Sequence, residues 1–133
     1  MEPDLTVQSK VKEKFEKFIG RGYITKGRVD SLISYFTVPK GESDVQLVFD
    51  GTKSGLNSVL WAPSFHLPTV ESLLPSLTPG AWQRDIDIVE MFYNYSLDPA
   101  IQSYCGVDVH PYLSTTNEPR LAWMYWVRCV MGL

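Results

Sequence analysis

Residues 32–49 read LISYFTVPKGESDVQLVF, and this stretch predicts a β-hairpin. The runs 32–38 and 45–49 are rich in β-branched and aromatic residues, which favour strands. The residues between them, 39–44, include Pro, Gly, Ser and Asp, which favour turns. We therefore expect two antiparallel strands joined by a polar tip that carries Lys40.

A helix is predicted before the hairpin, over residues 7–19. Apolar residues recur there at helical spacing, and Gly20 and Gly22 supply the left-handed exit that ends many helices. Glu13 and Lys17 are spaced as an i,i+4 ion pair. The pattern is typical of an amphipathic surface helix, whose lysines could contact phosphate or simply face solvent. Its apolar stripe comprises Val11, Phe15, Phe18 and Ile19.

Short elements are predicted after the hairpin. Thr69 is a suitable N-cap for a helix over 70–74. Residues 82–87 favour a strand, and 88–95 then switch to helical character. Residues 104–109 and 121–130 favour two more strands. The mixture predicts an α+β fold, with hairpins and short helices on one small antiparallel sheet. We divide the chain into a helical lead-in, 1–29, and a single domain, 30–133.

The composition is that of an ordinary folded chain. It has 133 residues, of which 44% are hydrophobic and 20% charged, enough for one small core. The net charge of −3 argues weakly against a general nucleic-acid binder. The distribution is uneven, because residues 1–40 carry eight basic and five acidic side chains, and the rest carry four and ten.

The remaining bulk features predict an intracellular protein, in the cytoplasm or nucleus. No apolar run approaches the ~20 residues that span a bilayer, and the first residues lack the order of a signal peptide. Cys105 and Cys129 lie far apart and are expected to be reduced, partly buried thiols. His66 and His110 have no partners at metal-ligand spacing and are expected to face solvent or form hydrogen bonds.

Three carboxylates, Asp85, Asp87 and Glu90, lie within six residues at the predicted strand-to-helix junction. In a strand, Asp85 and Asp87 would lie on the same face. Clustered carboxylates repel one another unless a cation lies between them, and Mg²⁺ prefers such oxygens together with substrate phosphates. The alternative is structural, because helix N-termini attract acidic residues through the helix dipole alone.

Three segments, in this order, resemble the start of a reverse transcriptase (RNA-directed DNA polymerase) domain of a mobile element. The part similar to its fingers hairpin is FTVPKG, at 36–41, and VQLVFD, at 45–50, followed by Asn57. DIVEMFYNYSLDP, at 87–99, resembles the palm motif in which an aromatic follows a metal-binding Asp by five residues. WVRCVMGL, at 126–133, resembles the strand leading to the motif that lies against template and primer.

The resemblance implies a role for each matched residue. Asp87, with the backbone carbonyl of Ile88, would bind the two catalytic Mg²⁺ (or Mn²⁺) ions. Phe92 would lie under the sugar of the incoming deoxynucleotide and exclude a 2′-OH. Backbone N–H groups around Glu90 and the Lys40 ammonium would bind the triphosphate. Without the resemblance, Phe92 is more simply a core residue, and Lys40 a solvated charge at a hairpin tip.

Two departures from the family pattern limit the expected activity. Gln46 stands where the family usually has an Arg that reaches the triphosphate, so weaker nucleotide binding is expected. The later Y-x-D-D strand is absent, so we predict no polymerase activity for this chain alone. Mg²⁺, template-primer (RNA or DNA) and deoxynucleotides are expected only with a complete domain. We also expect the final strand to lack sheet partners and to expose an apolar edge.

The sequence thus predicts a fragment of an RNA-directed DNA polymerase, comprising most of the fingers and the first part of the palm. One alternative is a non-catalytic module that binds nucleic acid or another partner. It would use the basic first helix and the aromatics Trp123, Tyr125 and Trp126, which can stack on bases but are more often core residues in a strand. A second alternative is a decayed mobile-element relic. The oligomeric state is left open.

Overall fold

Helix α1 (Leu5–Gly20) is the longest helix in the computed structural model, which describes residues 4–113, 117–118 and 122–133. The Asp4 side chain caps it, accepting a hydrogen bond from the backbone N–H of Thr6 at 2.8 Å. The chain leaves the helix through Gly22, at φ 69°, in the left-handed conformation that glycine permits. The predicted helix is therefore confirmed, and its buried face comprises Val11, Phe15 and Phe18.

One predicted ion pair on α1 is wrong. Glu13 pairs with Lys10, and Lys17 pairs with Glu90, a residue far along the chain. The tertiary partner replaces the local one because Glu90 is brought against the last turns of the helix, where it also meets Arg21. Helix α1 is therefore tied to a distant segment by charge as well as by its apolar face.

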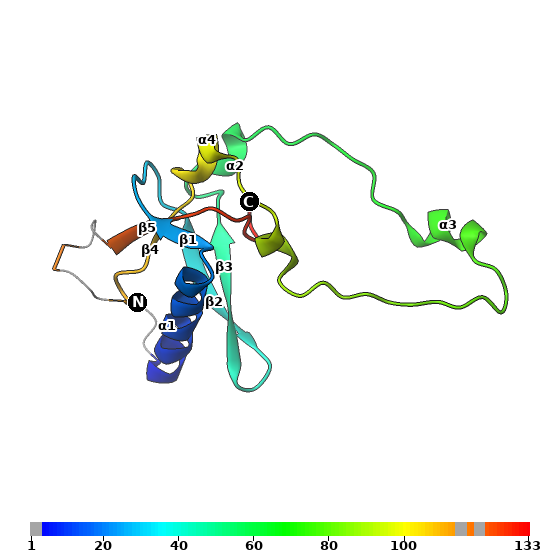
Figure 1. Ribbon diagram of the computed structural model, residues 1–133, viewed down its shortest axis with the longest axis horizontal. Helices are drawn as coiled ribbons and strands as arrows, with labels where there is room; N and C mark the ends of the chain where they lie inside the picture. Colours follow the sequence, from blue (N-terminus) through cyan, green and yellow to red (C-terminus); the bar gives the residue numbers. More distant parts are fainter. Residues whose placement is uncertain (1–3, 114–116, 119–121) are drawn as a thin grey trace.

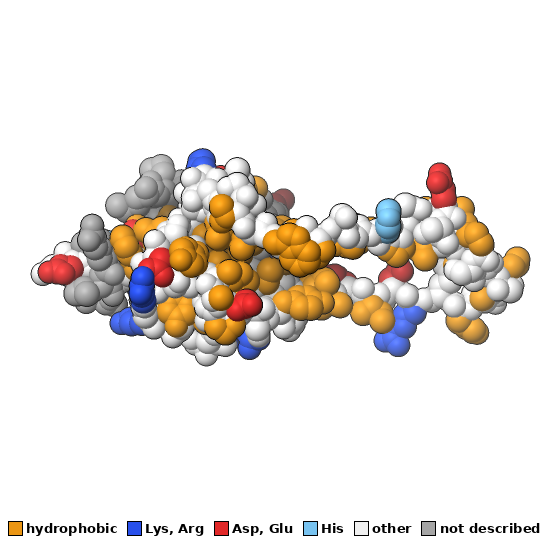
Figure 2. Space-filling view, turned by 90° about the horizontal axis from the view of Figure 1, so that it is seen from above, with side chains coloured by type: hydrophobic (Ala, Val, Ile, Leu, Met, Phe, Trp, Pro, Cys, Tyr) orange, Lys and Arg blue, Asp and Glu red, His pale blue; other side chains and the backbone are white. Residues whose placement is uncertain are grey.

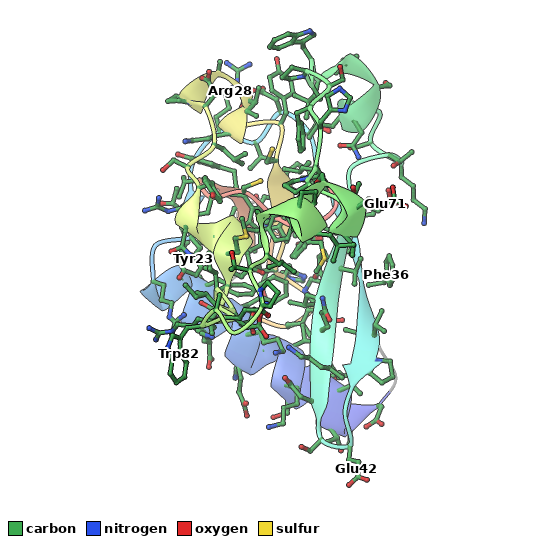
Figure 3. The ribbon with its side chains drawn as sticks, turned by 90° about the vertical axis from the view of Figure 1, so that its right-hand side faces the viewer. Tyr23, Arg28, Phe36, Glu42, Glu71 and Trp82 are labelled. Carbon is green, nitrogen blue, oxygen red and sulfur yellow. The ribbon has the colours of Figure 1, made fainter. Side chains whose placement is uncertain are left out.

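The predicted hairpin is confirmed as β2 (Ser34–Lys40) and β3 (Asp44–Asp50). The strands are antiparallel, with Ser34 opposite Asp50 and Lys40 opposite Asp44. Alternate residues of β3 point into the core, as a strand requires: Val45, Leu47 and Phe49. Phe36, on the other face, is exposed and points outward from the hairpin in Figure 3.

A second sheet contains β1 (Ile24–Lys26), β4 (Gly106–Asp108) and β5 (Trp123–Trp126). Its order is β1-β5-β4, and both pairings are antiparallel. The α+β class is confirmed, with two small sheets where one was expected. The expectation of an unpaired final strand is wrong, because β1, from the first part of the chain, covers one edge of β5 and β4 covers the other.

Helix α1, the hairpin and the three-stranded sheet share one core (Figure 1). Trp126 is fully buried at its centre. Its ring lies 5.6 Å from Tyr93, nearly parallel to it, and 5.1 Å from Phe49, edge to face. The lead-in 1–29 therefore packs in the same core as the rest of the chain. It contributes Val11, Phe15, Phe18 and Ile24 to that core.

Residues 61–89 form a long excursion, hereafter the arm, which leaves the core after α2 (Leu56–Val59) and returns to it at Glu90. Figure 1 shows it projecting far to the right. Every residue of the arm is exposed. Figure 2 shows hydrophobic side chains along it, and Figure 3 shows the fully exposed Trp82 extending away from the body.

The short helix at the tip of the arm is confirmed as α3 (Val70–Leu73), which continues as the 3-10 turn η1 (Leu74–Ser76). Thr69 is its N-cap, as predicted. The Thr69 hydroxyl accepts a hydrogen bond from the backbone N–H of Ser72. In return, the Ser72 hydroxyl accepts a hydrogen bond from the backbone N–H of Thr69. This reciprocal capping box satisfies two backbone donors locally, so the helix needs no tertiary contact at its start.

Two predictions for the returning segment are wrong. Residues 82–87 form no strand, and in place of a helix over 88–95 there is a 3-10 turn, η2 (Met91–Asn94). A strand is stabilised by a neighbouring edge, and on the arm residues 82–87 pair with none of the described strands. Asp85 and Asp87 therefore do not share a strand face. Helix α4 (Pro99–Gln102) follows, capped by the Asp98 side chain.

The two thiols agree with the sequence-based expectation. Both are free, with Cys105 fully buried and Cys129 half-buried. Burial raises the pKa of Cys105 to about 11, so its reactive thiolate is scarce at neutral pH. Among the described residues, no helix has the length and apolar character needed to cross a membrane.

Candidate nucleotide-binding groove

A groove of about 350 Å³ lies between α1, β3 and η2. Five of the six residues that the sequence singled out line it, and they come from two distant parts of the chain. The hairpin supplies two of them, and the returning segment supplies three. They are Lys40, Gln46, Ile88, Glu90 and Phe92.

The hairpin register presents Lys40 and Gln46 together. Lys40 is opposite Asp44, and Gln46 is opposite Val38. Because side chains alternate along a strand, Lys40 and Gln46 lie diagonally on one face of the hairpin. The tip carries the ammonium and the adjacent strand carries the amide, so the groove has both a charged and a neutral hydrogen-bond donor here.

Tyr93 anchors η2 beside the groove. Its ring is stacked between Trp126 and Tyr23, with centroids 5.6 Å and 5.1 Å away. Burial, together with the nearby charge of Glu90, raises the pKa of Tyr93 to about 12. Successive side chains of a 3-10 turn point about 120° apart, because the turn has roughly three residues. Burial of Tyr93 therefore leaves Phe92 on the groove side, where its side chain is 46% exposed.

Glu90 is held by three donors from the end of α1 and the residues after it. Its carboxylate accepts from the Lys17 ammonium and the Arg21 guanidinium, and the Tyr23 hydroxyl lies 3.4 Å away. The hydrogen bond from Lys17 is the main cause that lowers the pKa of Glu90. Figure 3 places Tyr23 beside the returning chain. The prediction gave Glu90 a role through its backbone, and the structure adds this side-chain contact.

The groove is basic. Among the described residues that line it, Lys14, Lys17 and Lys40 are cationic and Glu90 is anionic. The Lys14 ammonium lies 3.2 Å from Asp44. Hydrogen bonds from the Val45 backbone and from Lys14 lower the pKa of Asp44. Two of the three lysines are thus partly neutralised by carboxylates of the chain itself.

From sequence, the α1 lysines are expected to contact either phosphate or solvent, and they are not predicted to line this groove. The signal was present, because Lys14, Lys17 and Arg21 follow i, i+3, i+7 spacing and so form one stripe on the helix. The segment that faces this stripe is the one in which the arm returns to the core. No local sequence pattern specifies where that return occurs.

Asp87 stands apart from the groove. It is exposed at the end of the arm, next to Ile88, which does line the groove. Within the described ranges, no group of three His, Cys, Asp or Glu side chains is arranged to hold a metal ion. One carboxylate and one carbonyl supply too few oxygens for Mg²⁺, which needs near-octahedral coordination. The residues described here therefore do not make a complete magnesium site by themselves.

Asn57 and Gly132 connect the first and third motif segments directly. The Asn57 side-chain amide donates to the Gly132 carbonyl at 3.0 Å. Gly132 has φ 116°, and a Cβ there would lie 1.9 Å from the Phe49 carbonyl oxygen, so only glycine lets the end of the chain pack against β3. The neighbouring Met131 lines the groove. All three motif segments therefore meet in one region.

The aromatics proposed for the alternative binding module are largely structural. Trp126 is fully buried in the core, and Trp123 and Tyr125 are half-buried in the central strand β5. A base cannot stack on a ring that is already enclosed. The sheet therefore offers less stacking surface than the sequence indicated.

No protein-family model matches this chain, and no curated protein matches it in sequence. Its fold is nevertheless similar to a solved structure, the foamy viral protease-reverse transcriptase in complex with dsDNA. The match has a TM-score of 0.70 at 13% sequence identity, and it covers 100% of this chain. The chain spans only 25% of the length of that protein. The likeness shows an α+β, reverse-transcriptase-like fold.

Proposed function

We propose that this chain is part of an RNA-directed DNA polymerase domain, in which the groove receives the incoming deoxynucleoside triphosphate. One observation carries the proposal: residues that the reverse transcriptase resemblance singles out, from separate segments, line a single basic groove. The similar fold of a reverse transcriptase solved with dsDNA supports it, and it implies template-primer as the nucleic-acid partner. Nucleotidyl transfer with two Mg²⁺ ions would need carboxylates beyond those described here.

Each groove residue has a chemical task in this proposal. Lys40 supplies a point charge to the triphosphate, as ammonium groups do at many phosphate sites. Gln46 donates a neutral hydrogen bond where an arginine would give a stronger, bidentate one. The exposed ring of Phe92 packs against the sugar and leaves no room for a 2′-OH. The chain alone is expected to bind nucleotide weakly and to catalyse no polymerisation.

Calorimetric titration of the purified chain with dATP and ATP, in the presence of Mg²⁺, tests the proposal. Lys40→Ala is expected to weaken dATP binding about three- to tenfold, and Gln46→Arg to tighten it about tenfold, as charge-assisted contacts would. Phe92→Ala is expected to reduce the preference for dATP over ATP. Lys53→Ala removes a lysine outside the groove and serves as the control.

The proposal fails if Lys40→Ala and Lys53→Ala bind dATP equally well. It also fails if wild type and Phe92→Ala discriminate equally between the two sugars. Circular dichroism of each variant confirms that the fold is retained, since all these side chains lie at the surface of the core.

A further inference from the structure

Three hydrogen-bond donors converge on one carboxylate, that of Glu90. They are the side chains of Lys17, Arg21 and Tyr23. Lys17 lies in the last turn of α1, and Arg21, four residues later, is the C-cap of that helix. The Tyr23 backbone N–H donates to the Phe18 carbonyl at 2.9 Å, and its ring stacks on Tyr93, so its hydroxyl is fixed in place. All three donors come from one short stretch of chain. They therefore keep their arrangement whichever anion they hold.

The anion that fills this site, the Glu90 carboxylate, is weakly tethered on one side. Glu90 is at φ 54°, and no other non-glycine residue in the described part of the chain has a positive φ. That conformation costs about 1–2 kcal/mol. The preceding residues, 61–89, are all exposed and contribute nothing to the core. The carboxylate can therefore leave without disturbing buried packing, while Tyr93 keeps η2 in place.

The site is also continuous with the groove, because Lys17 lines both. Ammonium and guanidinium groups bind phosphate with the same charge-assisted hydrogen bonds that they give to carboxylate. A polyphosphate extending along the groove from Lys40 towards Lys17 must compete with Glu90 for this cation. We propose that Lys17, Arg21 and Tyr23 form a phosphate site that the chain's own Glu90 carboxylate occupies until a polyphosphate displaces it.

Displacement has a consequence for Asp87. Glu90 is the first residue of the returning segment that is held by the core, and Asp87 lies three positions earlier on the exposed arm. Release of Glu90 frees residues 86–90 to move, so phosphate binding at α1 loosens the segment that carries Asp87. That the polyphosphate is a nucleoside triphosphate rests on the proposed function. The exchange of Glu90 for another anion does not depend on it.

Calorimetric titration with inorganic tripolyphosphate tests the exchange without a nucleotide. Glu90→Gln, which removes the competing charge, is expected to bind tripolyphosphate about tenfold more tightly than wild type. Glu71→Gln makes the same change in net charge on α3, which Figure 1 shows on the arm, and is expected to bind like wild type. Adding Arg21→Met to Glu90→Gln should remove the gain. Equal binding by the two single variants, or a gain that survives loss of Arg21, overturns the proposal.

A second measurement needs no variant. Hydrogen exchange of the Tyr93 amide, which donates to the Glu90 carbonyl at 3.0 Å, is expected to become faster in the wild-type protein when tripolyphosphate is added, because Glu90 is released. Unchanged or slower exchange overturns the proposal. Titration with an oligonucleotide without terminal phosphates distinguishes the other source of phosphate. If Glu90→Gln gains more affinity for the oligonucleotide than for tripolyphosphate, the site binds a nucleic-acid backbone. That result would overturn the proposal that it binds a polyphosphate.

Failure of the exchange and failure of the proposed function are separable. If Glu90→Gln binds tripolyphosphate more tightly but the groove variants do not affect dATP, the anion exchange stands and the nucleotide role falls. If Lys40 and Phe92 control dATP binding while Glu90→Gln changes nothing, the reverse holds.

Discussion

Among single residues, Gly106, the first residue of β4, shows how closely the preceding chain packs against that strand. Its N–H donates to the Ser31 carbonyl at 2.9 Å, and its own carbonyl accepts from Ile33 at 2.8 Å. A Cβ at Gly106 would lie 2.3 Å from a Val29 methyl group and 2.5 Å from the Ser31 carbonyl oxygen. The backbone atom cannot move aside as a flexible side chain could.

Gly106→Ala is therefore expected to lower the free energy of unfolding by about 1–3 kcal/mol, the usual range for overpacking. Urea denaturation followed by tryptophan fluorescence measures the loss. Gly20→Ala is the matched control, because nothing lies within 4 Å of a Cβ at this last helical position. It should be neutral or stabilise by about 0.4–1 kcal/mol. Equal effects of the two substitutions would contradict the close approach.

At the scale of elements, α1 joins the hairpin to the three-stranded sheet. Phe15 is fully buried, and its ring meets Tyr35 edge to face at 5.4 Å and lies 6.0 Å from Tyr112. Phe18, one turn later, lies 5.2 Å from Trp126 at the centre of the sheet. One helix face thus packs against both sheets. The boundary at residue 29 marks a change in sequence pattern and does not divide the core.

We expect Phe15→Ala to cost about 3–5 kcal/mol of unfolding free energy, as removal of a buried ring does. Thermal and urea unfolding should show one cooperative transition at lower stability, because the helix and the sheets share one core. Ile19→Ala, at a position 39% exposed on the same helix, is the control and should cost less. A second, separate transition in Phe15→Ala would indicate that residues 1–29 form an independent unit.

At the scale of the whole molecule, the arm and the body have different stabilities. The arm is held by local turns and one capping box, whereas the core elements before and after it are joined by sheet pairing and buried aromatics. Regions with few buried contacts open most readily. The arm is also the most apolar exposed segment that the structure describes. Its exposed apolar side chains include Trp61, Phe65, Leu67, Trp82 and Ile86.

Brief trypsin treatment is therefore expected to cleave after Arg84, on the arm, before it cleaves after Arg28 or Lys53. The nicked protein should stay together in gel filtration, because β1, before the arm, pairs with β5, after it. Arg84→Gln should delay this cut without affecting the others, as mass spectrometry of the fragments would show. Earlier cleavage at Lys53 would indicate that the arm is covered by contacts absent from this structure.

The sequence alone determined the elements whose signals are local. The helix 5–20, the hairpin 34–50 and the Thr69 cap follow from apolar spacing, turn residues and side-chain hydrogen bonds within a few positions. The resemblance motifs also selected five residues of the groove before their proximity was known. Local periodicity cannot, however, indicate whether a strand-like segment finds a neighbouring edge. Periodicity therefore predicts a strand over 82–87 that does not form, whereas the unpaired final strand is expected only because the later Y-x-D-D strand is absent.

Which distant segments meet depends on how the whole chain packs. The tertiary structure placed β1 beside β5, Tyr93 between Trp126 and Tyr23, and Glu90 on the cations of α1. These contacts depend on burial and charge pairing between residues 33 to 102 positions apart, which no pattern along the chain encodes. The same packing left Asp87 on the exposed arm, so its predicted metal role depends on groups beyond those described.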